Sequence, residues 1–446
     1  MEVKIIDETI VLPTLPPFNE DHTLALSHID NDRNIQVNFR YLRAYVNSNS
    51  NPADPVHIIS EALSKALVHY YPLAGTLRRR SEDSRFELLC SVGQGVPVIR
   101  AVANQTLESL NYLDDPAEKL LEELVPDPKY EDVLAHPFSL KITIFACGGF
   151  SLGSSVHHSM CDGFGSGMFF NAMAELARGS SEISTKPVWE RASQLGPRNP
   201  PRVEFPFHEF LLLDKEFSPY KCKESSSNLS TRECFHVENQ ALERFKGLLY
   251  EQSGGKKFTT FEALGALIWQ ARVKASKIPS EEKVKFAYSL NIRNQLKPVL
   301  PSGYWGNSCV AMYVQLTVQE LLQQTSWETA ELISKSKRNA TDEYVRSFID
   351  FQELHYADGI TAGKGVSGFT DWRHLGQSTV DFGWGGPVTV LPFSRNLLGS
   401  VEPCFFLPYS SAVHGGKKDG FKVLVSLPET AIVDFRVEMA RFGSKL

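Results

Sequence analysis

The sequence predicts an α/β fold of two domains, each a mixed β-sheet flanked by helices. The chain has 446 residues, and at about 100 to 200 residues per domain this is too long for one small module. Both halves of the chain combine helical and strand periodicities. A proline-rich stretch without clean periodicity, residues 186–220, separates them and is typical of an extended crossover. We therefore expect one domain over residues 1–185 and a second over residues 221–446.

The composition is that of an ordinary globular protein. Hydrophobic residues make up 42% of the chain and charged residues 22%, enough for large cores. The 46 Lys and Arg against 52 Asp and Glu give a formal net charge of -6, so no overall positive field would attract a nucleic acid. We expect no nucleic-acid partner, whereas a local basic patch could still bind an anionic small molecule.

The cysteines and the N-terminus indicate the compartment. The seven cysteines are odd in number, widely spread and never spaced as C-x-x-C, so we expect reduced thiols and no zinc site. The N-terminal residues carry scattered charges and no apolar signal region. No run of about 18 apolar residues occurs anywhere. These patterns predict a cytoplasmic protein that neither binds nor crosses a membrane.

In the first half, apolar residues at helical spacing predict a helix over 57–70, which ends before Pro72. Alternating residues on both sides of Gly148 and Gly149 predict a β-hairpin over 142–158. A glycine-rich turn follows the hairpin. The next helix carries an apolar stripe and stops at Gly179.

In the second half, the sequence Thr259-Thr260-Phe261-Glu262 has the form of a capping box and predicts the start of an apolar helix. Alternation over 284–292 predicts a half-buried strand. Strands and helices therefore mix in this half as well, which favours a mixed sheet with surface helices.

The segment after the hairpin, His157-His158-Ser159-Met160-Cys161-Asp162-Gly163, carries the strongest chemical signal. Consecutive strand residues point to opposite faces, so the two histidines cannot both serve one metal centre. His158 lies where strand gives way to loop, and its imidazole can take a proton near neutral pH. A catalytic base and a hydrogen-bonded histidine at the strand end are both open interpretations.

Asp162 lies four residues after His158, across a turn. Its carboxylate could orient the imidazole, or face away and anchor the loop by pairing with an arginine. A second segment, Asp381-Phe382-Gly383-Trp384-Gly385-Gly386-Pro387, is a glycine-dense turn between apolar stretches. By itself it predicts a tight structural turn in which Trp384 packs and Asp381 caps.

Together, HHSMCDG near the middle and DFGWGGP near the end resemble the two motifs of the plant BAHD acyltransferases, which acylate alcohols or amines from acyl-CoA thioesters. Other segments agree in the order of that family, and the resemblance spans essentially the whole chain. The agreeing segments are Leu26-Ser27-His28-Ile29-Asp30-Asn31, Tyr71-Pro72-Leu73-Ala74-Gly75-Thr76-Leu77, Asn291-Ile292-Arg293 and Gly303-Tyr304-Trp305-Gly306-Asn307.

The resemblance implies a chloramphenicol acetyltransferase-like pair of domains with an active-site channel along their interface. Part of the 360–400 segment would pack on the N-terminal domain. His158 would act mid-channel as the general base, without a covalent acyl-enzyme. Acyl-CoA would be a co-substrate, no cofactor or metal would be bound permanently, and the protein would act as a monomer.

The resemblance also assigns roles to the motif residues. Asp162 would pair with Arg293 away from the channel, and Asp381 would be structural, as would Gly163, Gly383 and Gly385. The indole N–H of Trp384 would be a donor to the developing oxyanion. For the CoA phosphates, the candidates are Lys256 and Lys257 with the helix N-terminus at Thr260, and Arg373 as a second cation.

Several stretches are most similar to the spermidine hydroxycinnamoyltransferase branch of the family, including SLNIRNQLKPVLPSGYWGN and FTDWRHLG. This implies a hydroxycinnamoyl or benzoyl donor and a polyamine acceptor. A polyamine would need acidic groups near its binding site. Relatives with polyamine acceptors can carry an acidic residue after the DFGW core, where this chain has Gly385 and Gly386. An alcohol acceptor, such as benzyl alcohol or an alkaloid or terpenoid hydroxyl, therefore remains the alternative.

Overall fold

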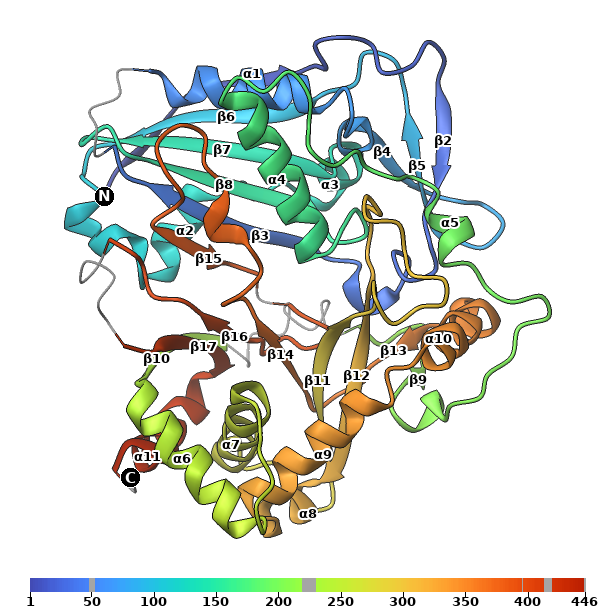
Figure 1. Cartoon of the computed structure of the whole chain (residues 1–446), viewed down its shortest axis with the longest axis vertical. Coiled ribbons are helices and arrows are strands. Elements are labelled where there is room, and N and C mark those ends of the chain that lie inside the picture. The colour runs from blue at the N-terminus through green and yellow to red at the C-terminus, as the bar shows by residue number, and fades with distance from the viewer. Residues whose placement is uncertain (48–52, 219–229, 395, 413–418, 445–446) are drawn as a thin grey trace.

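Two six-stranded sheets with helices around them form the protein (Figure 1). This computed structural model describes residues 1–47, 53–218, 230–394, 396–412 and 419–444. Each sheet contains both parallel and antiparallel neighbours, so both are mixed. The predicted fold class is confirmed.

The first sheet consists mainly of strands from the first half of the chain. Its order is β1-β6-β7-β8-β3-β15, with β6 and β7 parallel and the other neighbours antiparallel. The strands are β1 (Val3–Val11), β3 (Asn38–Tyr45), β6 (Val96–Ala103), β7 (Phe138–Phe145), β8 (Phe150–His157) and β15 (Thr389–Pro392).

The second sheet is built from the second half. Its order is β10-β17-β16-β14-β11-β12, and β14 runs parallel to both of its neighbours. The strands are β10 (Ser230–Val237), β11 (Lys283–Asn291), β12 (Cys309–Thr317), β14 (Val366–Asp371), β16 (Cys404–Leu407) and β17 (Phe421–Pro428). Two small sheets complete the strands: β2 (His22–Ala25), β4 (Thr76–Arg79) and β5 (Phe86–Cys90), and β9 (Leu212–Leu213) with β13 (Ile360–Thr361).

The helices lie around the sheets. In the first half, α1 and α4 pack against each other, while α2 and α3 contact β8. In the second half, α7 packs against α9 and α11. The helices are α1 (Pro55–Ala66), α2 (Glu118–Leu124), α3 (Tyr130–Ala135), α4 (Gly163–Ala177), α5 (Arg191–Gln194), α6 (Asn239–Gln252), α7 (Thr260–Ala275), α8 (Val318–Gln323), α9 (Ser326–Arg338), α10 (Asp342–His355) and α11 (Glu429–Ser444).

Local sequence signals account for several element boundaries. The Asp54 side chain accepts a hydrogen bond from the Val56 backbone, so α1 begins two residues earlier than the periodicity predicted and also ends earlier. The predicted hairpin forms as β7 and β8, with Gly148 at φ +76° in the turn. The predicted capping box at α7 is present with both of its hydrogen bonds.

The proline-rich crossover carries structure of its own. It contains α5 and β9, and Val188 pairs with Tyr304 of the second half. Residues 219 and 220 of this segment and Cys222 lie outside the described residues. Later in the chain, the segment after β14 returns to the first sheet, where β15 pairs with β3 as its edge strand (Figure 1). The second half therefore supplies one strand to the first sheet, and the crossover pairs with the second half.

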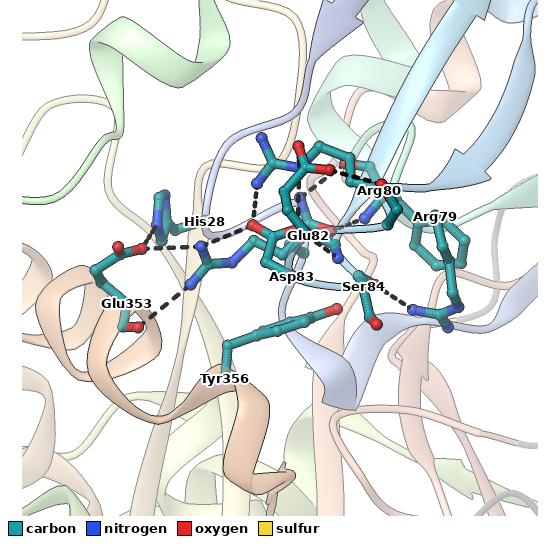
Figure 2. Close-up of polar contacts among 12 residues, drawn as sticks. His28, Arg79, Arg80, Glu82, Asp83, Ser84, Glu353 and Tyr356 are labelled. Atoms are coloured by element: carbon teal, nitrogen blue, oxygen red, sulfur yellow. Dashed lines mark hydrogen bonds and ion pairs between the residues drawn. The ribbon is translucent and has the colours of Figure 1, made fainter.

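A cluster of charged side chains, called here the rim cluster, joins the two halves near α10 (Figure 2). Glu353 of α10 accepts a hydrogen bond from His28 Nε2 at 2.7 Å and pairs with Arg85 at 2.9 Å. Asp83 in turn contacts Arg85 and Arg80. The rim cluster therefore connects three segments that are far apart in the sequence.

The described residues include no helix that is both long and apolar enough to span a membrane. They also contain no group of three or more His, Cys, Asp or Glu side chains placed to hold a metal ion.

Candidate active site

His158 follows the last residue of β8, where β8 meets β3. Its backbone N–H donates to the Val37 carbonyl at 2.8 Å, and its own carbonyl accepts from Asn307 Nδ2 at 2.7 Å. The imidazole meets the Phe39 ring edge to face, with centroids 5.7 Å apart. These contacts hold the histidine from two separate segments, one around β3 and one at Asn307, before any substrate is present.

The two adjacent histidines face different cavities, as strand geometry requires. His158 lines a cavity of about 370 Å³ between the halves of the chain. His157 is 1% exposed, packs edge to face on Phe86 and faces a separate cavity of about 700 Å³. Burial lowers the pKa of His157 to about 3, so this side chain stays neutral at any ordinary pH.

His158 is set up to accept a proton. Burial lowers its pKa below the ordinary value, and the negative charge of Asp162 opposes part of that shift. The imidazole is therefore neutral at pH 7, with a nitrogen available as an acceptor. A neutral imidazole on a cavity wall can serve chemically as a general base.

The Asp162 carboxylate accepts its hydrogen bonds from groups other than the imidazole of His158. Its carboxylate accepts two hydrogen bonds from Arg293, at 3.0 and 3.1 Å, and one from the Ser308 backbone at 3.0 Å. It also caps α4 by accepting from the Gly165 backbone at 2.8 Å. The arginine pair implied by the resemblance is present. The carboxylate ties the start of α4 to the second half of the chain.

Gly163 begins α4 at a point where the segment before β15 comes close. Its carbonyl accepts from Gln377 Nε2 at 3.0 Å. A Cβ added there would meet Leu375 at 3.5 Å, an ordinary van der Waals contact. Neither contact requires a glycine, because any residue has the carbonyl and a Cβ would fit, so the structural role expected for Gly163 stays a prediction.

Asn307 and Asp30 form a hydrogen-bonded chain behind the His158 backbone. The sequence analysis assigned no role to either residue. One Asn307 amide donates both to the His158 carbonyl and to Asp30 Oδ1, the latter at 2.9 Å. Asp30 is fully buried and accepts two more hydrogen bonds from Ser27. Both residues lie inside family segments recognised in the sequence, and this was the only signal that could have singled them out.

The DFGWGGP segment forms a turn at the opposite end of β8. Asp381 Oδ1 accepts from the backbones of Gly383 and Gly385, both at 2.8 Å, and both glycines have positive φ. Arg178 at the end of α4 donates to the Asp381 carbonyl. Asp381, Gly383 and Gly385 thus hold a tight turn, which fits their expected structural role.

The prediction for Trp384 is wrong. Its indole packs edge to face on Phe150, the first residue of β8, with centroids 5.2 Å apart. His158 follows the last residue of that strand, and the seven steps between its eight residues, at about 3.3 Å each, place the two ends roughly 23 Å apart. The indole N–H therefore cannot reach an oxyanion at His158. The DFGWGGP motif by itself does not show at which end of β8 its turn packs.

The catalytic cavity, as we call the cavity lined by His158, has an apolar wall and a few charged groups. Phe39, Val156, Phe369 and Trp372 contribute to the wall. The charged side chains that line it are Asp32, Asp162, Lys337 and Asp371. Of these four charged residues, the sequence analysis singled out only Asp162. The other three come from three separate segments that share no sequence pattern.

The CoA candidates lie around the start of α7. Thr260 is the first residue of α7, and the next residue, Phe261, lines the catalytic cavity. Lys257 is exposed, and Lys256 pairs with Glu331 at 2.5 Å. Arg373 does not line this cavity: it pairs with Asp371 at 2.6 Å and lies over the Phe421 ring.

Known proteins are similar to this chain over nearly its whole length. The model of a family described as the Transferase family matches residues 1–441. A spermidine coumaroyl-CoA acyltransferase of Arabidopsis thaliana is 33% identical over 94% of this chain and 91% of its own length. A 3'-N-debenzoyl-2'-deoxytaxol N-benzoyltransferase of Taxus canadensis is 34% identical over 98% of this chain and 95% of its own.

Other relatives act on alcohols by name, and solved structures share the fold. A taxadien-5-alpha-ol O-acetyltransferase of Taxus cuspidata is 32% identical over 100% of this chain and 98% of its own. The crystal structure of vinorine synthase superposes with a TM-score of 0.74 at 20% identity, over 99% of this chain and 98% of its own. The chain therefore belongs to the BAHD family of acyl-CoA-dependent acyltransferases.

Proposed function

We infer that the protein moves an acyl group, hydroxycinnamoyl or benzoyl, from a CoA thioester to an amine, with spermidine as the first choice of acceptor. The observation that carries the proposal is a neutral imidazole, held at the end of β8, that faces an apolar cavity between the two halves of the chain. The relative that is named a spermidine coumaroyl-CoA acyltransferase supports the choice of acceptor and donor.

In this mechanism His158 removes a proton from the acceptor nitrogen as that atom attacks the thioester carbonyl. The C–N bond forms, the carbonyl oxygen takes up the negative charge, and a tetrahedral intermediate results. The intermediate then reforms the carbonyl as the C–S bond breaks and the CoA thiolate leaves. The imidazolium returns the proton to the thiolate, which restores the neutral base.

The cavity thiols support direct transfer without an acyl-enzyme. Cys161 and Cys309 both line the catalytic cavity. Burial, as the largest cause, raises the pKa of both thiols, and the neighbouring Asp162 charge raises them further. Neither thiol becomes a thiolate at neutral pH. The Ser166 hydroxyl in the same wall is bonded to Tyr41 Oη at 2.6 Å.

For the CoA phosphates, the proposal keeps Lys256, Lys257 and the α7 N-terminus at Thr260. The position of Phe261 in the cavity wall supports it, because a ligand that extends from His158 past this ring would leave the protein beside those groups. Arg373 remains the second cation of the proposal: it follows the cavity residue Trp372 and, like Lys256, already has a carboxylate partner, here Asp371 at 2.6 Å.

The O-acetyltransferase relative supports a second candidate, transfer to an alcohol. The two candidates differ in the bond that is made. A matrix assay of purified protein with several acyl-CoAs against polyamines and alcohols, read by product mass, distinguishes an amide from an ester. We also propose that the protein acts as a monomer, because both halves of one chain line the cavity.

Replacement of the base tests the mechanism. We expect His158→Ala to lower kcat by about 10²- to 10⁴-fold, which is the usual contribution of a general base. The melting temperature should hardly change, because the lost ring faces a cavity. His57→Ala on the exposed face of α1 is the matched control and should keep full turnover. A fully active His158→Ala protein would exclude this mechanism.

A further inference from the structure

Asp32 is a buried carboxylate in the wall of the catalytic cavity. It is 5% exposed and lines the cavity together with His158. Ile29 and Ile35 from the same segment, and Leu397 and Leu398 from the segment after β15, line the cavity as well. The carboxylate is therefore placed in mainly apolar surroundings, on the surface that a substrate would touch.

Asp32 has no cationic partner among the described residues, and the other cavity carboxylates do. Asp162 pairs with Arg293, and Asp371 pairs with Arg373. Arg33, which follows Asp32 directly, sends its guanidinium elsewhere and donates to the carbonyls of residues 214 and 215. The charge of Asp32 is thus the one in this wall that the described protein leaves uncompensated.

The hydrogen bonds of Asp32 come from neutral groups. The backbone and the side-chain amide of Asn34 both donate to Oδ1 at 2.9 Å. Gln352 is the next polar neighbour, and neither of its amide atoms makes a hydrogen bond of good geometry within the described structure. Burial raises the pKa of Asp32, and these neutral neighbours oppose only part of that rise.

Capping alone does not explain an aspartate at this position. Asp32 caps the short 3-10 helix Arg33–Ile35 through its bond from the Asn34 backbone. Asparagine caps about as well as aspartate and would be buried at a far lower cost, because it carries no charge. A buried carboxylate without a cation becomes favourable when a bound ligand supplies that cation.

We propose that Asp32 binds the ammonium group of an acyl acceptor that carries a second, non-reacting amine. This rests on the proposed amine acyl transfer and names the acceptor class as a diamine or polyamine. The reacting amine loses its proton at His158, while the distal amine stays charged at Asp32. The four apolar side chains listed above suit the methylene chain between the amines.

The test compares Asp32→Asn with the unchanged protein on two kinds of acceptor. One is spermidine, and the other is a primary alcohol or monoamine without a second amine. Asparagine keeps the cap and the shape but removes the charge. We expect the ratio of kcat/KM for spermidine to that for the second acceptor to fall about 10- to 100-fold, the usual effect of a charged hydrogen bond. A ratio that stays constant overturns the proposal.

A control variant tests whether the change in the ratio is specific to Asp32, and a binding measurement tests the role of Asp32 without relying on turnover. Asp127→Asn removes a carboxylate that pairs with Arg40 at the other cavity, and should leave the ratio unchanged. Calorimetric titration of spermidine should show at least ten-fold weaker binding to Asp32→Asn, and equal affinity overturns the role of Asp32. A protein that binds spermidine through Asp32 but acylates only alcohols would support the site and exclude the amine transfer.

Discussion

Among the ion pairs that join the halves of this protein, two groups differ clearly in burial. The Asp162–Arg293 pair is nearly sealed, with side-chain exposures of 4% and 11%. In the rim cluster, Glu353 is 35% exposed and meets His28 and Arg85 near the surface (Figure 2). Water can replace the partners of Glu353 but not those of Asp162. We therefore expect similar contacts to contribute very differently to stability.

The largest effect is expected at the buried pair. Asp162→Asn keeps an acceptor for the α4 cap but leaves Arg293 without its anion. Removal of one partner of a buried pair typically costs about 3 to 5 kcal/mol of unfolding free energy. Turnover should fall as well, because α4 and the loop that carries Asn307 shift together. Chemical denaturation and kcat measure both effects, and a stable but inactive variant would instead indicate that Asp162 orients His158 directly.

The pH dependence comes next, through His157, the last residue of β8. The folded protein holds the pKa of His157 at about 3, whereas an unfolded histidine titrates at about 6.5. As pH falls below 6.5, only the unfolded state takes up the proton, so stability falls. At pH 5 this contributes a loss of about 2 kcal/mol. His28 and His158, whose pKa values burial also lowers, should act in the same direction.

Unfolding free energies measured from pH 7.5 to 5 check this expectation. His157→Asn removes the group with the largest shift and should flatten the profile, although its stability at pH 7.5 can differ. A slope that is unchanged in His157→Asn would show that other groups cause the loss at low pH.

The smallest effect is expected at the rim cluster. Glu353→Gln keeps the shape and removes the charge that pairs with Arg85 and accepts from His28. Because the carboxylate is partly solvated, we expect a loss of about 0.5 to 1 kcal/mol and unchanged kcat. The melting temperature and its dependence on salt measure it. If Glu353→Gln lost as much unfolding free energy as Asp162→Asn, burial would not explain the difference between the two groups of ion pairs.

Local patterns were the part of the fold that could be predicted. The capping box at Thr259, the β7–β8 hairpin and the strand β11 are properties of a few adjacent residues, and all three are present. The half-buried character predicted for β11 is wrong, because residues 284–288 are buried on both faces of the sheet. The helix predicted over 57–70 was displaced, because Asp54 caps it earlier than the apolar spacing suggested. The ends of a helix depend on single side-chain hydrogen bonds, which the spacing of apolar residues does not reveal.

For the site, the sequence by itself determined that His157 and His158 face opposite ways, because alternation is a property of any strand. The order of motifs determined the family and pointed to His158 and to Asp162 with Arg293. Only the tertiary structure decided the rest. It placed Trp384 at the far end of β8 and paired Arg373 with Asp371. It also left Asp32, in the cavity wall, without a cationic partner among the described residues, since burial and charge pairing arise between segments that the sequence keeps far apart.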